Sequence, residues 1–597
     1  MNPNDDPLSP TPCEAPADRP RHLRPVAGLL LLGAFCWIFF VRTAFHGILI
    51  NDGYNYAASA RNFLAGKGFL WETHGVQEYS GLPDGRVVSR EGMSRTTFPS
   101  FLYPLLLAPA IAWIGPNDGA IALVGGLFFV ALIPAIYLLA FRLYGAAAGM
   151  LAGALTALNA KMLYYSISGD PLPLYAFLLA LAVLFLVTGR SWKALFVGGL
   201  CAALIAWTKE VGAIVAATIV AFAVVVRWRE FGPKALAAVV GALAMAGLLS
   251  IARPLLNPPL PPAPPPTVLE PASAERPPAP ATPRRGALAQ AASLWLSRAL
   301  IFSDERPGHT FERSLDARSG FDIWRGHLGS LAAKMGRNAR EVARVVLYQV
   351  TQPVLVWLFW AGGIIFLRHA LSRRLFALTL LLFLVQGGVC AVLFVMHRYF
   401  HVFIPLMIVP AAGLLDRGLA ALRRGRPGRR VAAAFLGVLA VVALSYPWCV
   451  TAGVDREHRA CDAMCWFAAR VDGPRLARLG AFIREKTPPD EVVVTDAPWI
   501  AWWHGDRTSV WIPVDMPTLQ ALQRRVRVDW LLLTFEYWRE METWKDWLRG
   551  AGDAGGSLDG FRFVSAFVED DYRAYLFKAE SIPARAPDLP SGDPAGR

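Results

Sequence analysis

The side chains best suited to chemistry stand at the ends of apolar segments. Asp52 follows closely on the apolar segment 26–48. A carboxylate at such a boundary is partly desolvated, so it can act as a base near neutral pH. Asp is also a common N-cap residue where a helix starts at a water interface. From the local sequence, both interpretations of Asp52 stand.

The residues after Asp52 predict a helix with further polar groups. Tyr54, Tyr56 and Arg61 fall on nearby faces of that helix, and Gly66-Lys67-Gly68 ends it. We take these three side chains as candidate substrate-binding residues beside a candidate catalytic Asp52.

Other ionisable or aromatic residues stand at predicted span ends on the same side of the membrane. Charged groups at membrane depth are costly, so they usually line a polar cavity or pair with each other. Lys209 and Glu210 could instead reach the headgroups, and Asp170 could start a helix before Pro171. For His397, a hydrogen-bonded interface role is favoured over metal ligation. The further candidate binding residues are Asp170, Lys209, Glu210, His397, Arg398 and Tyr399.

The composition indicates that an integral membrane protein positions these groups. Of 597 residues, 55% are hydrophobic and only 17% are charged, and the mean hydropathy is +0.38. Soluble proteins carry about 25% charged residues. This excludes a cytosolic enzyme and a secreted disulfide scaffold. The net charge of +14 lies in short breaks between apolar segments, which fits the positive-inside bias and predicts no nucleic-acid partner.

Charge and length together predict the topology. Segment 99–115 is too short to span and begins with prolines, so we expect a juxtamembrane helix on the outer face. The N-terminus is then cytoplasmic, and the tail after residue 450 is outside. About eleven spans are predicted, at 26–48, 120–140, 145–163, 171–189, 193–207, 211–226, 235–252, 345–367, 375–396, 402–415 and 431–450.

Three large regions are predicted on the outer side. The first is loop 50–99, and the second is the Pro-rich loop 253–343, which leads into an amphipathic helix over 321–345. The third, 451–585, predicts a soluble α/β domain. Its expected strands are 492–495, 510–512 and 530–534 with a hairpin of 561–568 and 574–578, and its expected helices are 476–485, 516–525 and 539–549.

Smaller features complete the predicted organisation. We expect residues 1–25 and 586–597 to be disordered. For Trp502-Trp503-His504, packing inside the tail domain or at headgroup level is favoured over stacking on a sugar. The cysteines lack metal-site spacing, so no metal ligands are predicted, although a divalent cation in catalysis is left open.

Several segments resemble the GT-C superfamily of membrane glycosyltransferases that use polyprenyl-phosphate sugars. This superfamily includes protein O-mannosyltransferases, lipid A aminoarabinose transferases and mycobacterial arabinofuranosyltransferases. Ala60-Arg61-Asn62-Phe63 and Gly66-Lys67-Gly68-Phe69 resemble its first outer loop. The stretch 98–105, and His397-Arg398-Tyr399 with Phe403-Ile404-Pro405, resemble later elements. One position departs from the pattern: Asn51 stands where the family often has an acidic residue before Asp52.

The resemblance implies an all-α polytopic membrane bundle of GT-C type, followed here by the α/β domain. It implies a glycosyltransferase of the hexosyl- or pentosyltransferase class, in the inner membrane of a bacterium. Its partners would be a polyprenyl-phosphate sugar donor, membrane lipids, and a glycan, lipid or protein acceptor. Asp52 would be the general base of an inverting transfer. Arg90 and Arg95 lie where aminoarabinose transferases place a basic residue on the lipid phosphate.

The alternative function is a multi-spanning transporter or flippase of a lipid-linked glycan. Such a protein also needs many spans and charged groups at membrane depth. However, transporters often show internal repeats, and the long outer loop and soluble tail are unusual for one.

Overall fold

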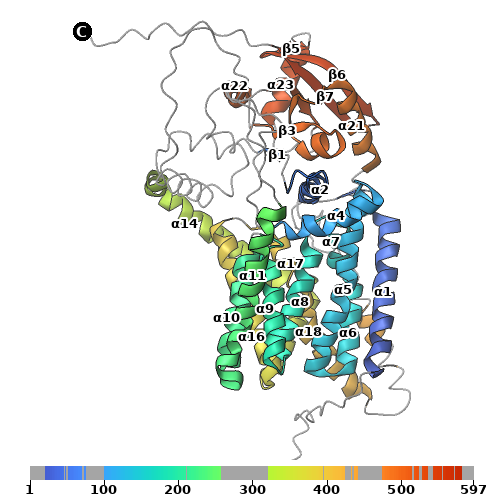
Figure 1. The fold of residues 1–597 in the computed structure, drawn as a ribbon, viewed down its shortest axis with the longest axis vertical. Helices are drawn as coiled ribbons and strands as arrows, with labels where there is room; N and C mark the ends of the chain where they lie inside the picture. Colours follow the sequence, from blue (N-terminus) through green and yellow to red (C-terminus); the bar gives the residue numbers. More distant parts are fainter. Residues whose placement is uncertain are drawn as a thin grey trace, which may run out of the picture.

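A computed structural model shows a helical bundle with a mixed sheet at one end (Figure 1). The bundle is built from helices that are apolar on most faces, and the sheet comes from the C-terminal part of the chain. The residues that the structure describes are 20–45, 47–48, 51–69, 73–74, 100–209, 211–256, 320–393, 395–423, 432, 436–441, 473–513, 516–523, 528–534, 542–553, 556–570 and 572–580.

Helices before residue 260 form the first part of the bundle. Asparagine and serine side chains begin several of them: Asn117 caps α5, Asn159 caps α7, and Ser191 caps α9. The elements are α1 (Pro20–Ala44), α2 (Asn51–Leu64), α4 (Leu102–Ile114), α5 (Asp118–Tyr144), α6 (Ala146–Ala157), α7 (Ala160–Ser168), α8 (Leu172–Thr188), α9 (Trp192–Ala206), α10 (Gly212–Phe231), η2 (Gly232–Leu236) and α11 (Ala237–Leu256).

The remaining helices of the bundle follow the Pro-rich stretch. The predicted amphipathic helix is confirmed as α14, which projects obliquely from the bundle in Figure 1. Pro353 opens the next helix after a bend of 90°, because proline cannot continue a helix from the preceding turn. The elements are α14 (Gly320–Arg344), η3 (Val345–Gln349), α15 (Pro353–Ile365), α16 (Ala370–Val392), α17 (Arg398–His401) and α18 (Ile404–Arg423).

The multi-span character of the protein is confirmed. Within the described residues, five helices are long and apolar enough to cross a membrane, or up to seven if each of two bent pairs is one span. The segment 212–254 counts as one candidate there, although we predicted two spans. The expected span 431–450 falls mostly outside the described residues. The count of eleven therefore stays a prediction.

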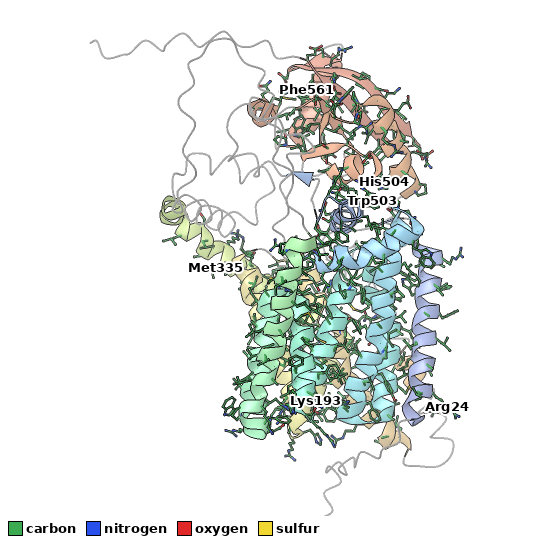
Figure 2. The ribbon with its side chains drawn as sticks, viewed as in Figure 1. Arg24, Lys193, Met335, Trp503, His504 and Phe561 are labelled. Carbon is green, nitrogen blue, oxygen red and sulfur yellow. The ribbon has the colours of Figure 1, made fainter. Side chains whose placement is uncertain are left out.

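The bundle has two distinct ends. Arg24 and Lys193, from two of the predicted cytoplasmic breaks, lie at the end far from the sheet, whereas Trp503 and His504 lie at the near end (Figure 2). Helices α2 and α4 lie between the bundle and the sheet (Figure 1). Helix α4 occupies the segment predicted to be juxtamembrane.

The C-terminal region combines helices with one sheet of parallel and antiparallel strands, so the predicted α/β character is confirmed. β2 pairs in parallel with β3 and β4, and β4 pairs antiparallel with the predicted hairpin. Leucine and isoleucine side chains of α21 pack on one face of the sheet. Met516 and Leu519 of α22 and Trp544 and Trp547 of α23 pack on the other. The elements are α21 (Gly473–Lys486), β2 (Val492–Thr495), η4 (Ile500–His504), β3 (Thr508–Trp511), α22 (Met516–Gln523), β4 (Trp530–Leu533), α23 (Glu542–Asp553), β5 (Ser557–Leu558), β6 (Phe561–Glu569) and β7 (Tyr572–Ala579).

Two features of this region differ from expectation. A short strand from the first outer loop, β1 (Thr73–His74), joins the edge of the sheet in parallel with β3. In addition, Trp502 and Trp503 belong to the apolar cluster of the helical bundle, so they lie at the junction of the two regions and outside the core of the C-terminal sheet. Two-residue strands and interface residues have no periodic signal in the sequence, because their partners are distant in the chain.

Candidate active site

The site forms where the start of α2 meets the end of α7. Gly53 and Gly169 approach so closely that a Cβ on Gly53 would lie 2.8 Å from the Cα of Gly169. Gly169 ends α7 in the left-handed conformation, with φ of +84°, which costs glycine little and other residues more. Asp52 precedes one of these glycines and Asp170 follows the other. The glycine contact therefore brings the two acidic residues near each other.

A chain of four charged side chains crosses this junction. The Arg398 guanidinium lies 2.8 Å from the Asp52 carboxylate and 3.6 Å from that of Asp170. The Lys209 ammonium lies 3.2 Å from the same Asp170 oxygen. The sequence predicted all four as site residues, and the structure brings them together from α2, α17 and the loops after α7 and α9.

Exposure differs along this chain of charges. Asp170 is fully buried and also accepts a hydrogen bond from the backbone N–H of Leu172 at 2.9 Å. The Asp52 side chain is 33% exposed, so an incoming molecule can reach it. Burial lowers the pKa of Arg398, but the carboxylates of Asp52 and Asp170 outweigh burial and raise its pKa overall. Arg398 is therefore a permanent cation between two acids.

A cavity of about 20 Å³ adjoins the charges, lined by Lys209, Arg398 and Asp170. Tyr399 closes one side, with its ring 5.3 Å from the Lys209 ammonium and 6.0 Å from the Arg398 guanidinium. Gln386 and Tyr175 also line it. The cavity itself has room for about one water molecule, and the two cations beside it are groups that bind an anion such as a phosphate.

A divalent cation does not fit between Asp52 and Asp170 as they stand. Arg398 lies between the two carboxylates, and Lys209 neutralises the second, so a metal ion would meet two positive charges. Within the described ranges, no group of three or more His, Cys, Asp or Glu side chains could hold a metal.

The other predicted residues lie around this cluster. Tyr56 makes an edge contact with Tyr103 of α4, and the Nε2 of His397 lies 3.4 Å from a carboxylate oxygen of Glu341 on α14. The Tyr54 hydroxyl donates to Asp118 of α5, and its ring contacts Trp503 and His504 of the C-terminal region. The Arg61 guanidinium donates to the carbonyl of Trp502 in the same region. Their roles in substrate binding stay predictions. Glu210, Arg90 and Arg95 lie outside the described residues.

Sequence reasoning missed a second polar group beneath the site. His401, fully buried, lies one helical turn after Arg398. Its Nδ1 is 2.8 Å from the Tyr165 hydroxyl, and its Nε2 is 3.2 Å from the Lys161 ammonium. Lys161 also donates to the carbonyl of Gln349 at 2.9 Å. This group anchors the turn that carries Arg398. The signal in the sequence that could have indicated this group is the pair Tyr164-Tyr165, shortly before Asp170.

Asp118 was also missed, although it lies two residues before the predicted span 120–140 and meets the rule applied to Asp170. Its carboxylate accepts hydrogen bonds from Ile48, Tyr54 and Trp503. The signal that could have found it is an acidic residue that follows Gly-Pro-Asn directly before an apolar run.

No family model and no curated protein matches the sequence. The fold, in contrast, is similar to solved structures of the oligosaccharyltransferase from Archaeoglobus fulgidus. The form tethered with an acceptor peptide has a TM-score of 0.54 at 14% identity, covering 92% of this chain and 73% of that chain. The complex with an inhibitory peptide and a dolichol-phosphate has a TM-score of 0.53 at 14% identity, covering 95% and 75%.

The apo form of the same enzyme has a TM-score of 0.53 at 15% identity, covering 87% of this chain and 70% of that chain. The similarity extends through both the helical bundle and the C-terminal region, since so much of the chain is covered. This chain therefore shares its fold with that oligosaccharyltransferase over most of its length, in agreement with the resemblance of its first outer loop to the GT-C glycosyltransferases.

Proposed function

We propose that this protein transfers a sugar from a polyprenyl-phosphate donor to an acceptor hydroxyl on the outer face of the membrane. The GT-C fold supports the class of reaction, and a structural neighbour binds a dolichol-phosphate. The observation that carries the proposal is the charge cluster, in which a reachable carboxylate, Asp52, lies 2.8 Å from a permanent cation, Arg398. The region 451–585 is then extracytoplasmic, and the N-terminus is cytoplasmic.

The chemistry follows from the charges. Asp52 removes the proton from the acceptor hydroxyl, whose oxygen forms a bond to the anomeric carbon. The bond from that carbon to the phosphate oxygen breaks, the polyprenyl phosphate leaves, and the anomeric configuration inverts. Arg398 and Lys209 stabilise the negative charge that gathers on the departing phosphate.

The ion pairs couple donor binding to activation of the base. Without a substrate, the two carboxylates and the two cations balance each other. A donor phosphate draws Arg398 and Lys209 toward itself, so Asp52 loses part of its counter-charge and becomes a stronger base. The base is thus most effective when the donor is in place.

The test uses purified protein with a panel of polyprenyl-phosphate sugars. Asp52→Asn keeps an oxygen that can accept from Arg398 but removes the base, so kcat should fall by about 10²- to 10⁴-fold. The matched control is Asp506→Asn, because Asp506 also lies near an arginine, 3.8 Å from Arg61, but outside the cluster. Equal transfer by Asp52→Asn and the parent protein would remove Asp52 from this role. Movement of a lipid-linked glycan between the two leaflets of a vesicle membrane, without any sugar transfer, would support the flippase alternative.

A further inference from the structure

Asp118, the first residue of α5, joins three separate segments through one carboxylate. Its Oδ2 accepts from the backbone N–H of Ile48 and from the hydroxyl of Tyr54, both at 3.2 Å. Its Oδ1 accepts from the indole Nε1 of Trp503 at 3.1 Å. Ile48 precedes α2, Tyr54 lies on α2, and Trp503 belongs to η4 of the C-terminal region.

The C-terminal region also holds the far end of α2. The Arg61 guanidinium donates to the carbonyl of Trp502 at 3.2 Å and lies 5.5 Å from the ring of Trp503. Nearer the start of α2, the ring of Tyr54 contacts His504 with centroids 5.4 Å apart. Figure 2 shows Trp503 and His504 where the C-terminal region meets the bundle. Both ends of α2 are thus fixed by the same short segment.

Helix α2 needs such contacts to keep its place. It has only 14 residues, among them a glycine near its start, and isolated helices of about 12–15 residues are marginal in water. Asp52 lies two residues before Tyr54, in the first turn. Any motion of Tyr54 therefore changes the position of Asp52 relative to Arg398.

Asp118 is not needed to begin its own helix. Asn117 is the N-cap of α5, and its side chain accepts from the backbone N–H of Ala120 at 3.0 Å. The Asp118 carboxylate points to other segments instead. Tyr54 and Trp503, which donate to it, are 1% and 7% exposed, so their contact with the carboxylate is shielded from water.

We propose that Asp118 is a positioning residue: it holds the first turn of α2 in place, and through Trp503 it makes that place depend on the docked C-terminal region. The inference rests on the proposed function of Asp52, because it concerns the position of the base. It assigns a role to the C-terminal region, which fixes the catalytic helix from outside the membrane.

The test combines kinetics with hydrogen exchange on the full-length protein. In Asp118→Asn, one carboxylate oxygen becomes an NH₂ group. The side chain can then no longer accept hydrogen bonds both from Ile48 and Tyr54 and from Trp503. We expect faster exchange at the Ile48 amide and in the first turn of α2. We also expect a fall in kcat of about 10- to 100-fold, as for reacting groups displaced by up to 1 Å, with KM for the donor little changed.

Two further variants make the result specific. Asn117→Ala removes the cap of α5 but touches neither α2 nor the C-terminal region in the described contacts, so kcat and α2 exchange should match the parent. Trp503→Phe removes one of the three hydrogen bonds and should lower kcat less than Asp118→Asn does. It also serves as the test if Asp118→Asn fails to fold. Because the two residues share one contact, the double variant should lose less than the two single losses combined.

The outcomes separate this inference from the proposed function. Unchanged α2 exchange in Asp118→Asn would overturn the inference, whatever the protein transfers. Parental kcat in Asp118→Asn, with Asp52→Asn inactive, would overturn it and leave the proposed function standing. Full activity in Asp52→Asn would refute the proposed function, while the exchange data would still report whether Asp118 holds α2.

Discussion

The contact between Gly53 and Gly169 sets the distance between the two acidic residues of the site. A Cβ added at Gly53 would lie 2.8 Å from the Cα and 3.0 Å from the carbonyl carbon of Gly169. These are backbone atoms, which cannot rotate away as a flexible side chain can. In Gly53→Ala, α2 and the end of α7 must therefore separate by at least 0.6 Å, the difference between 2.8 Å and the 3.4 Å of ordinary contact.

That separation is large compared with the geometry it disturbs. The Asp52 carboxylate lies 2.8 Å from Arg398, and a shift of this size lengthens the contact beyond a strong charge-assisted hydrogen bond. A misplacement of about 1 Å can cost about 100-fold in rate, so we expect kcat to fall by about 10- to 100-fold. The added methyl group should also destabilise the fold by about 1–3 kcal/mol, partly offset by the better helix propensity of alanine.

The assay measures sugar transfer from a polyprenyl-phosphate donor, with thermal melting in detergent alongside. Gly388→Ala in α16 is the matched control, because nothing lies within 4 Å of its added Cβ. The reciprocal variant Gly169→Ala should be worse than Gly53→Ala, since its φ of +84° is strained for alanine. Parental kcat in Gly53→Ala, together with an inactive Asp52→Asn, would refute the claim that this contact places the base.

Two further predictions concern charge. Lys209→Met should destabilise the protein by roughly 3–5 kcal/mol, because it removes a partner of the fully buried Asp170. The double variant with Asp170→Asn should melt higher than Lys209→Met alone, and equal melting would contradict the pairing. Burial lowers the pKa of His504 below 6.5, Arg484 lowers it further, and Asp118 acts against both. Docking of the C-terminal region on the bundle should therefore weaken as the pH falls below about 6.5, because His504 takes up a proton more readily in the undocked state. His504→Phe should melt with a flatter pH dependence than the parent, and an unchanged pH dependence would count against the prediction.

The sequence predicted most of the secondary structure because each element carries its own local signal. The strand 492–495 was predicted at its observed bounds, and β4 differs by one residue. Other bounds shifted: β3 begins at Thr508, two residues before the prediction, and α23 runs from Glu542 to Asp553 instead of 539–549. Helix and strand ends depend on capping and pairing contacts, which periodicity does not report.

The members of the site were predicted by a rule about charge at membrane depth. That rule selected Asp52, Asp170, Lys209 and Arg398, which the structure brings together. It also selected His397, which pairs with Glu341 at the edge. Tyr54 and Arg61 were selected for their positions on the predicted helix. In the structure both contact the C-terminal region, and Tyr54 also donates to Asp118 of α5. The rule finds ionisable groups that need partners, but it does not say which partner each one has.

The sequence by itself determined that the chain is a multi-span membrane protein with an α/β tail. Burial of apolar runs and alternating patterns are local properties that any tertiary arrangement must respect. Only the tertiary structure decided that the C-terminal region contacts α2 through Tyr54 and Arg61 and α5 through the bond of Trp503 to Asp118, which are 385 positions apart. Pairing between such distant residues depends on how whole elements pack, and no local pattern records that packing.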